Sequence, residues 1–249
     1  MPLKLEQVAQ YVNDNIGTFH KARLEGLKKL KLVSLLKRKN PYLFRAKNLA
    51  PTALVSSLLD AFLSSSEEKH FGDFLEALAI FVSQQTANGV KSGVTGADLE
   101  FARDGVRYVV SIKSGPNWGN SSQYKALKAN FKTAVKVLKQ SKQIGEVQPV
   151  LGICYGATAP VNNGEYLKLT GQAFWYFLSG SEQLYIDLIE PIGFEAKRHN
   201  EEYEHERTKL YTRFTREFLT DYCENDEINW DKLLQLNSQS GILTADSFE

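Results

Sequence analysis

An aspartate, a serine and a lysine are spaced so that one β-hairpin would bring them together. The Asp-Gly pair at 104–105 is a strong hairpin signal, because a type I′ turn needs positive φ at both central residues. With that turn, Asp98 lies opposite Ser111 on the neighbouring strand. Side chains two residues apart on a strand share a face, so Glu100 and Lys113 join them. The sequence therefore predicts two acids, a hydroxyl and a lysine on one face of a hairpin.

This set of side chains is typical of metal-dependent phosphodiester chemistry. Mg²⁺ is usually held by one or two carboxylates together with substrate phosphate oxygens. A lysine beside the ion can stabilise developing negative charge or help to deprotonate the attacking water. The opposite face of the second strand carries Val106, Tyr108, Val110 and Ile112, which predicts packing against a core. The alternative is a hairpin whose polar face is open to solvent, since these polar types are common on surfaces.

Two motif regions resemble a known nuclease family. Asp98 followed by Ser-Ile-Lys at 111–113 resembles the bipartite motif of the PD-(D/E)xK nuclease superfamily. The stretch SIKSGPNW at 111–118 is similar to the corresponding loop of type II restriction endonucleases, in particular PmeII-like enzymes. The basic segment 37–48 (KRKNPYLFRAKN) resembles an N-terminal signature of those enzymes, and weaker similarity extends through 71–72, 150–156, 174–175 and 230–234.

The resemblance implies an enzyme that requires Mg²⁺ and hydrolyses double-stranded DNA at a specific site. It implies an α/β (α+β) fold with a central mixed β-sheet flanked by helices, in one restriction-endonuclease-like domain over residues 1–249 with a basic helical part at about 1–65. A homodimer is expected, because a two-fold protein matches a palindromic site, and the location is the prokaryotic cytoplasm. The alternatives are a structure-specific nuclease and a catalytically silent DNA-binding protein of the same fold.

The resemblance also assigns roles to the hairpin residues. Asp98 would bind the metal, and Lys113 would assist water activation or stabilise charge. The superfamily usually has Asp or Glu two residues before the lysine, where this chain has Ser111. Ser111 would therefore touch the metal only through water, and some restriction enzymes with this substitution import the missing carboxylate from elsewhere.

Two acids could supply that carboxylate. Glu100 is two residues from Asp98 on the same strand face. Glu76 lies in a predicted helix at 67–86 and falls off its apolar stripe, which is formed by Phe71, Phe74, Leu75, Leu78 and Val82. Residue type alone favours a solvated surface glutamate. The resembled superfamily often presents such an acid from a preceding helix, which favours Glu76 and leaves Glu100 open.

The expected DNA contacts come from the basic segment 37–48, the loop after Lys113 and a lysine-rich helix. The loop after Lys113 places a tryptophan among small and amide residues, which suits close approach to a polynucleotide. The helix predicted over 124–142 carries six lysines and no acid, at a spacing that costs helix stability unless a polyanion neutralises it. The residues assigned to DNA are Lys39, Asn40, Arg45, Lys47, Ser114, Asn117, Trp118, Asn120, Ser122, Gln123, Lys125 and Lys128.

Charge is strongly polarised along the chain. Residues 1–50 hold eleven Lys or Arg against three acids, whereas residues 200–249 hold five against twelve. The basic residues 1–50 suit contact with a phosphate backbone, whereas the acidic residues 200–249 would be repelled by it. An ordinary mixed surface is the alternative.

Composition excludes several function classes. We expect no membrane span, since no run approaches the roughly 20 apolar residues needed, and the first residues lack a signal-peptide pattern. Cys154 and Cys223 form neither a disulfide framework nor, without nearby partners, a zinc site. The four histidines show no ligand or triad spacing.

Periodicity predicts the remaining elements. Helices are expected at roughly 4–35, 51–64, 67–86, 199–222 and 228–236, and around 174–178. Strands are expected in the hairpin at 94–113, at 149–155 and at 166–170. A hairpin, a helix and then a buried strand indicate a mixed sheet flanked by helices.

Overall fold

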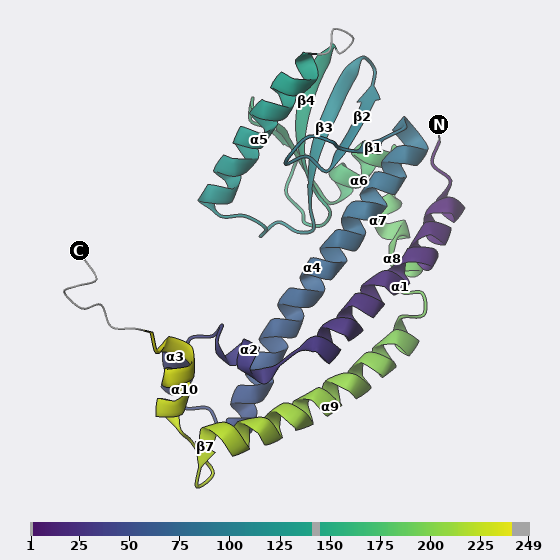
Figure 1. The fold of residues 1–249 in the computed structure, drawn as a ribbon. Coiled ribbons are helices and arrows are strands. Elements are labelled where there is room, and N and C mark those ends of the chain that lie inside the picture. Colours follow the sequence, from purple (N-terminus) through teal and green to yellow (C-terminus); the bar gives the residue numbers. More distant parts are fainter. Residues whose placement is uncertain (1, 141–144, 241–249) are drawn as a thin grey trace, which may run out of the picture. The chain divides into compact units, whose positions relative to one another are not determined.

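The computed structural model describes residues 2–140 and 145–240, which fall into two compact units (Figure 1). The first unit comprises Met1–Phe19 and Glu68–Ala196, and the second comprises His20–Glu67 and Lys197–Glu249. Helices α1 (Leu5–Lys29) and α4 (Pro51–Ala87) contribute residues to both units. The expectation of a single domain stays a prediction.

A six-stranded mixed sheet forms the centre of the first unit (Figure 1). Its order is β1 (Val90–Lys91), β2 (Leu99–Arg103), β3 (Val106–Lys113), β4 (Glu146–Ile153), β6 (Leu167–Thr170) and β5 (Val161–Asn162). The pairs β3/β4 and β4/β6 are parallel, and the other pairs are antiparallel. The predicted fold class, a mixed sheet flanked by helices, is confirmed.

The β2–β3 hairpin has the predicted turn and register. Asp104 and Gly105 both have positive φ, at 50° and 79°. Leu99 pairs with Val110, so the hairpin brings Asp98, which directly precedes β2, beside Ser111. A turn that fixes register also fixes which side chains share a face.

Both faces of the sheet are covered. One face packs against α1, α4 and α6 (Gln172–Ser179), in a core that includes Val110, Leu78 and Phe174. The other face packs against α5 (Ser121–Lys139), with Val109 fully buried beside Ala134. The polar face of the hairpin is therefore largely covered, since Glu100 and Ser111 are buried and only Asp98 and Lys113 keep part of their surface exposed. The alternative of a hairpin whose polar face is wholly open to solvent is wrong.

Some predicted element bounds differ from the structure. The helices expected at 51–64 and 67–86 form one helix, α4. The three serines at 64–66, between the two predicted helices, include no glycine or proline that would break a helix. The helix expected at 4–35 ends at Lys29, and α2 (Leu32–Leu36) follows. Strand β1 was not predicted, because two residues are too few to show the alternation of polar and apolar side chains that marks a strand. Lys142, the last lysine of the predicted stripe, lies outside the described residues.

The remaining elements complete the two units. In the first unit, α7 (Leu184–Asp187) and α8 (Ile189–Ile192) follow α6. In the second unit, α2, α3 (Pro41–Lys47), α9 (Ala196–Tyr222) and α10 (Trp230–Ser238) accompany the small hairpin β7 (Cys223–Glu224) and β8 (Glu227–Ile228). Its core contains Leu54, Leu58, Phe214, Phe218 and Leu233. No described helix has the combination of length and hydropathy that a membrane span needs.

Gly152 in β4 is needed for close packing of α6 on the sheet. A Cβ at this position would lie 2.1 Å from the ring of Phe174, which is fully buried. We expect Gly152→Ala to lower the free energy of unfolding by about 1–3 kcal/mol through overpacking, as measured by urea titration. The control is Gly17→Ala in α1, where an added Cβ meets nothing within 4 Å. It should be neutral or stabilising by up to about 1 kcal/mol, and an unchanged midpoint for Gly152→Ala would contradict the packing argument.

Candidate active site

Asp98 is bound to the start of the hairpin's second strand. Its Oδ2 accepts the backbone N–H of Ile112 at 2.6 Å and the hydroxyl of Ser111 at 3.3 Å. Among the described residues, the hydrogen bonds and ion pairs of Asp98 all use Oδ2. The side chain keeps a quarter of its surface exposed, and Oδ1 takes part in none of these contacts. The backbone therefore holds one oxygen fixed and leaves the other for a ligand.

Lys113 completes the predicted trio. Its ammonium lies 4.0 Å from Asp98 Oδ2 and 5.5 Å from the centre of the Trp118 ring. The lysine side chain is 31% exposed, so it contacts Asp98 and Trp118 and is also accessible to solvent. Ser111, in contrast, is 2% exposed and donates its hydroxyl to the aspartate. Ser111 is placed to orient Asp98.

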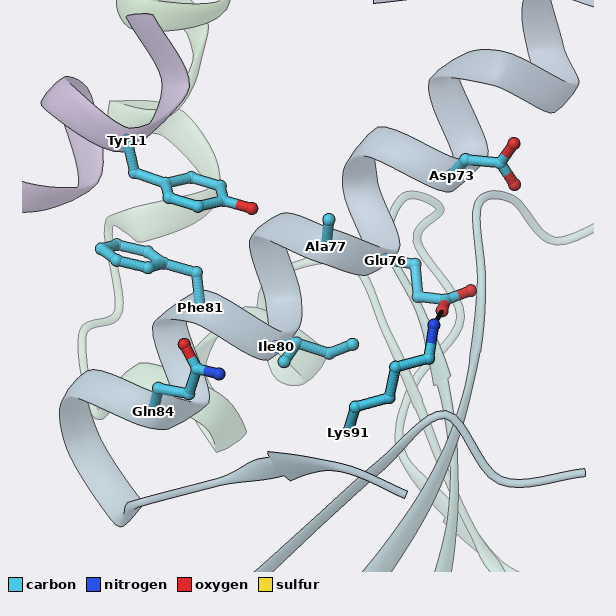
Figure 2. Close-up of a pocket in the computed structure, with 8 residues that line it drawn as sticks. All are labelled: Tyr11, Asp73, Glu76, Ala77, Ile80, Phe81, Gln84 and Lys91. Carbon is cyan, nitrogen blue, oxygen red and sulfur yellow. Dashed lines mark ion pairs between the residues drawn. The ribbon is translucent and has the colours of Figure 1, made fainter. Parts of the chain in front are cut away.

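Glu76 is presented from α4, on the other side of the sheet from Ser111 and Lys113. It lines a pocket of about 390 Å³ together with residues of α1, α4 and β1, and Figure 2 shows its carboxylate directed at Lys91. Glu76 Oε1 lies 3.7 Å from Lys91 Nζ, and the glutamate side chain is 30% exposed. The lysine belongs to the two-residue strand β1. The sequence did not reveal Lys91 as a partner of Glu76.

Electrostatics connects Glu76 with the hairpin acids. Burial raises the pKa of the Glu76 carboxyl, and the negative charge of Asp98 raises it further. Lys91 and Lys113 lower that pKa, and Asp73 raises it. Two carboxylates close enough to repel each other are stabilised by a bound cation. Asp98 and Lys113 are therefore paired on the hairpin, and Glu76 on α4 is near enough for its carboxyl to respond to the charges of both.

Glu100 has different partners. Its side chain is 5% exposed, and Oε2 accepts two hydrogen bonds from the guanidinium of Arg107, at 2.8 and 3.2 Å. Oε1 accepts the hydroxyl of Ser92 at 2.6 Å. Both carboxylate oxygens are therefore engaged, one by Arg107 of the hairpin and the other by Ser92, which follows β1. Period-two alternation places Arg107 on the same strand face, so this pair was readable from the predicted register.

The loop after Lys113 has local structural roles. Asn120 is the N-cap of α5, where it accepts hydrogen bonds from the N–H groups of Ser122 and Gln123, and Gln123 Oε1 accepts the Asn120 N–H in return. This capping box satisfies the free N–H groups of the first turn. The Trp118 ring packs beside Tyr124, with centroids 4.7 Å apart. These residues shape the loop, and their contact with DNA stays a prediction, as it does for the exposed Asn117 and the partly buried Ser114.

The lysine stripe of α5 is partly neutralised within the first unit. Lys128 forms an ion pair with Glu165, and Lys132 Nζ lies 3.6 Å from the same carboxylate. The hydrogen bond with Glu165 raises the pKa of Lys128. Lys125 is exposed, and no ion pair to it is recorded in the described part of the chain. Glu165, which lies between β5 and β6, could not be predicted as a partner of these lysines from the pattern of α5.

The donor set fits Mg²⁺. No group of three or more His, Cys, Asp or Glu side chains gathers as a metal site among residues 2–140 and 145–240. Asp98 and Glu76 offer hard carboxylate oxygens, and one or two carboxylates with water and substrate phosphate are what Mg²⁺ usually takes. Cys154, whose pKa burial raises to about 12, stays a neutral thiol and is no competing ligand.

Comparison with known families decides the class of protein. The family model of type II restriction endonuclease EcoO109I matches residues 6–200, well over half of the chain. The chain belongs to this family. Membership implies a nuclease that binds DNA and cleaves it at specific sites, a hydrolase of the type II restriction class. The PmeII-like subgroup suggested by the motifs stays a prediction, and a search of curated proteins finds no match.

Proposed function

We propose that this protein is a Mg²⁺-dependent type II restriction endonuclease whose active site is built from Asp98, Glu76, Lys113 and Ser111. The observation that carries the proposal is the Asp98–Lys113 pair, 4.0 Å apart on the β2–β3 hairpin, with Glu76 of α4 near enough for its carboxyl to respond to both charges. Family membership supplies the reaction class. A silent DNA-binding protein would have no need to hold a lysine beside two mutually repelling acids.

Each residue has a distinct role in this proposal. Asp98, through Oδ1, and Glu76 would hold the ion, and Ser111 keeps Asp98 Oδ2 in place. When bound, Mg²⁺ supplies Lewis-acid polarisation of the phosphate and acidifies water. Lys113 would donate a hydrogen bond to a phosphate oxygen and stabilise its charge, or would assist activation of the attacking water. Hydrolysis then forms a bond from water oxygen to phosphorus and breaks one P–O bond, and the leaving oxygen takes a proton.

A plasmid digest tests the proposal. Purified protein with Mg²⁺ should convert plasmid to discrete fragments, and EDTA should abolish them. A structure-specific nuclease would give no fixed fragments, and a silent binding protein would give none. The fragment ends would also define the recognised sequence.

We further propose that the lysines of α5 neutralise DNA phosphates. Changing Lys125, Lys128 and Lys132 together to Gln keeps helix propensity nearly constant and removes two solvent-exposed ion pairs, which contribute little to stability. Binding should weaken for specific and non-specific duplexes alike. The slope of log affinity against log salt should flatten by about 0.9 for each lost contact, as measured by fluorescence anisotropy.

Glu165→Gln is the matched control for the lysine variant. It removes the carboxylate that pairs with Lys128 and Lys132 and should leave DNA affinity equal or tighter. Unchanged affinity and slope in the lysine variant would show that the stripe is a solvated face. A homodimer and a single functional domain are also part of this proposal, and sedimentation of the DNA-free protein tests the dimer.

A further inference from the structure

The segment from Lys37 to Asn48 in the second unit presents apolar side chains among positive charges. Tyr42 is 66% exposed and Leu43 is 50% exposed, both on the short helix α3. The chain from residue 26 to residue 59 contains eight Lys or Arg and no Asp or Glu. Exposure of aromatic and aliphatic side chains to water is unfavourable. In this segment, basic residues precede and follow the two exposed apolar residues in the sequence.

Several residues of this segment have structural roles that account for their types. Asn40 caps the helix by accepting the Leu43 N–H, and buried Pro41 follows at the first helical position. Asn48 ends the helix in the left-handed region at φ 48°. The Arg45 guanidinium lies 5.5 Å from the centre of the Trp230 ring. These residues set the conformation of the segment and are the poorer candidates for ligand contact.

A side chain from α10 holds the segment in place. Asn237 Nδ2 donates hydrogen bonds to the carbonyl oxygens of Leu36 and Lys39, each at 2.9 Å. Pinning both ends of a basic turn reduces the entropy that a ligand would otherwise have to remove. The turn between α2 and α3 is therefore preorganised.

The side chains that remain without such a role form one set, which we call the α3 tip: Lys37, Arg38, Tyr42, Leu43 and Lys47. All five are exposed. In the described part of the chain, none of the five side chains takes part in a recorded ion pair or side-chain hydrogen bond. Three cations around two apolar side chains match the surface of duplex DNA, where phosphates flank base edges and thymine methyl groups.

We propose that the α3 tip docks on duplex DNA, with Tyr42 and Leu43 making apolar contacts to bases or sugars and with Lys37, Arg38 and Lys47 contacting phosphates. The inference rests on the proposed nuclease function and adds a specificity-determining contact to it. It also reassigns DNA contact within the segment, from Asn40 and Arg45 to Tyr42 and Leu43. The two sets of side chains have different signatures: apolar contacts change discrimination between sequences, and phosphate contacts change salt dependence.

The test measures binding of a duplex carrying the cleaved sequence and of an unrelated duplex of equal length, with Ca²⁺ in place of Mg²⁺. Tyr42→Ala and Leu43→Ala should each weaken specific binding by roughly 5- to 100-fold with an unchanged salt slope. The triple change of Lys37, Arg38 and Lys47 to Gln should weaken both duplexes equally and flatten the slope by up to about 0.9 per residue. Leu219→Ala, at an exposed leucine of α9 in the same unit, is the matched control and should change nothing.

Other results would overturn the inference. Wild-type affinity for both duplexes in Tyr42→Ala and Leu43→Ala would remove the apolar contact. Dissociation of a dimer by those variants, with unchanged DNA affinity, would assign the tip to an interface between copies. If the wild-type protein binds the duplex and all the variants bind it equally well, this inference alone is defeated. A wild-type protein that binds no duplex defeats the proposed function as well.

Discussion

Replacing Asp98 by Asn is expected to abolish cleavage while DNA binding and the fold survive. The amide oxygen can still accept the Ile112 N–H, now at 2.6 Å from Oδ2, but the charge that would hold Mg²⁺ is gone. Loss of an outer-shell partner of a metal typically costs 10–100-fold, so loss of a direct carboxylate should cost at least about 100-fold. Single-turnover cleavage at saturating DNA measures the rate, and anisotropy in EDTA measures binding.

Asp104→Asn is the matched control for this prediction. Asp104 sits in the same hairpin at positive φ, a conformation that Asn also tolerates, so the same chemical change there should leave cleavage unaltered. A near wild-type rate for Asp98→Asn would remove the centre of the proposed site. A parallel loss of DNA binding would instead indicate that the aspartate shapes the loop.

The hairpin could be predicted because its determinants are local. Residues 104–105 fix the turn, the turn fixes the register, and the register places Asp98 beside Ser111 and Lys113. The apolar residues Val110 and Ile112 then face a core as alternation requires. Each step needs information from fewer than twenty consecutive residues.

Contacts between distant segments could not be predicted in the same way. Lys91, which pairs with Glu76, belongs to an edge strand of two residues. Such a strand is too short to show the alternation of polar and apolar residues from which a strand is predicted. Glu165 meets Lys128 from a turn far along the chain, and no pattern in α5 predicts that acid. The packing of the Trp118 ring beside Tyr124 was not predicted either, and the expected contact of Trp118 with DNA stays a prediction.

The choice between the two candidate acids has the second large expected effect. Glu76→Gln should reduce cleavage by about 100-fold or more, because it removes a carboxylate that would hold the ion beside Asp98. Asp73→Asn, one turn earlier on α4 and ion-paired with Lys69, is the matched control and should leave the rate close to wild type. Single-turnover rates across a Mg²⁺ titration make the comparison, and the Glu76 variant should not recover fully at high Mg²⁺.

Glu100→Gln should act on stability instead of chemistry. It leaves the Arg107 guanidinium without its buried carboxylate, at a cost of about 1–3 kcal/mol in the free energy of unfolding, while cleavage by the folded protein stays near wild type. Urea titration and the cleavage rate together separate the two acids. The opposite pattern, a stable Glu100→Gln protein that cannot cut and an active Glu76→Gln protein, would move the ligand onto the hairpin. If both substitutions change the cleavage rate only slightly, Asp98 would be the only one of these carboxylates that binds the ion, together with water and substrate.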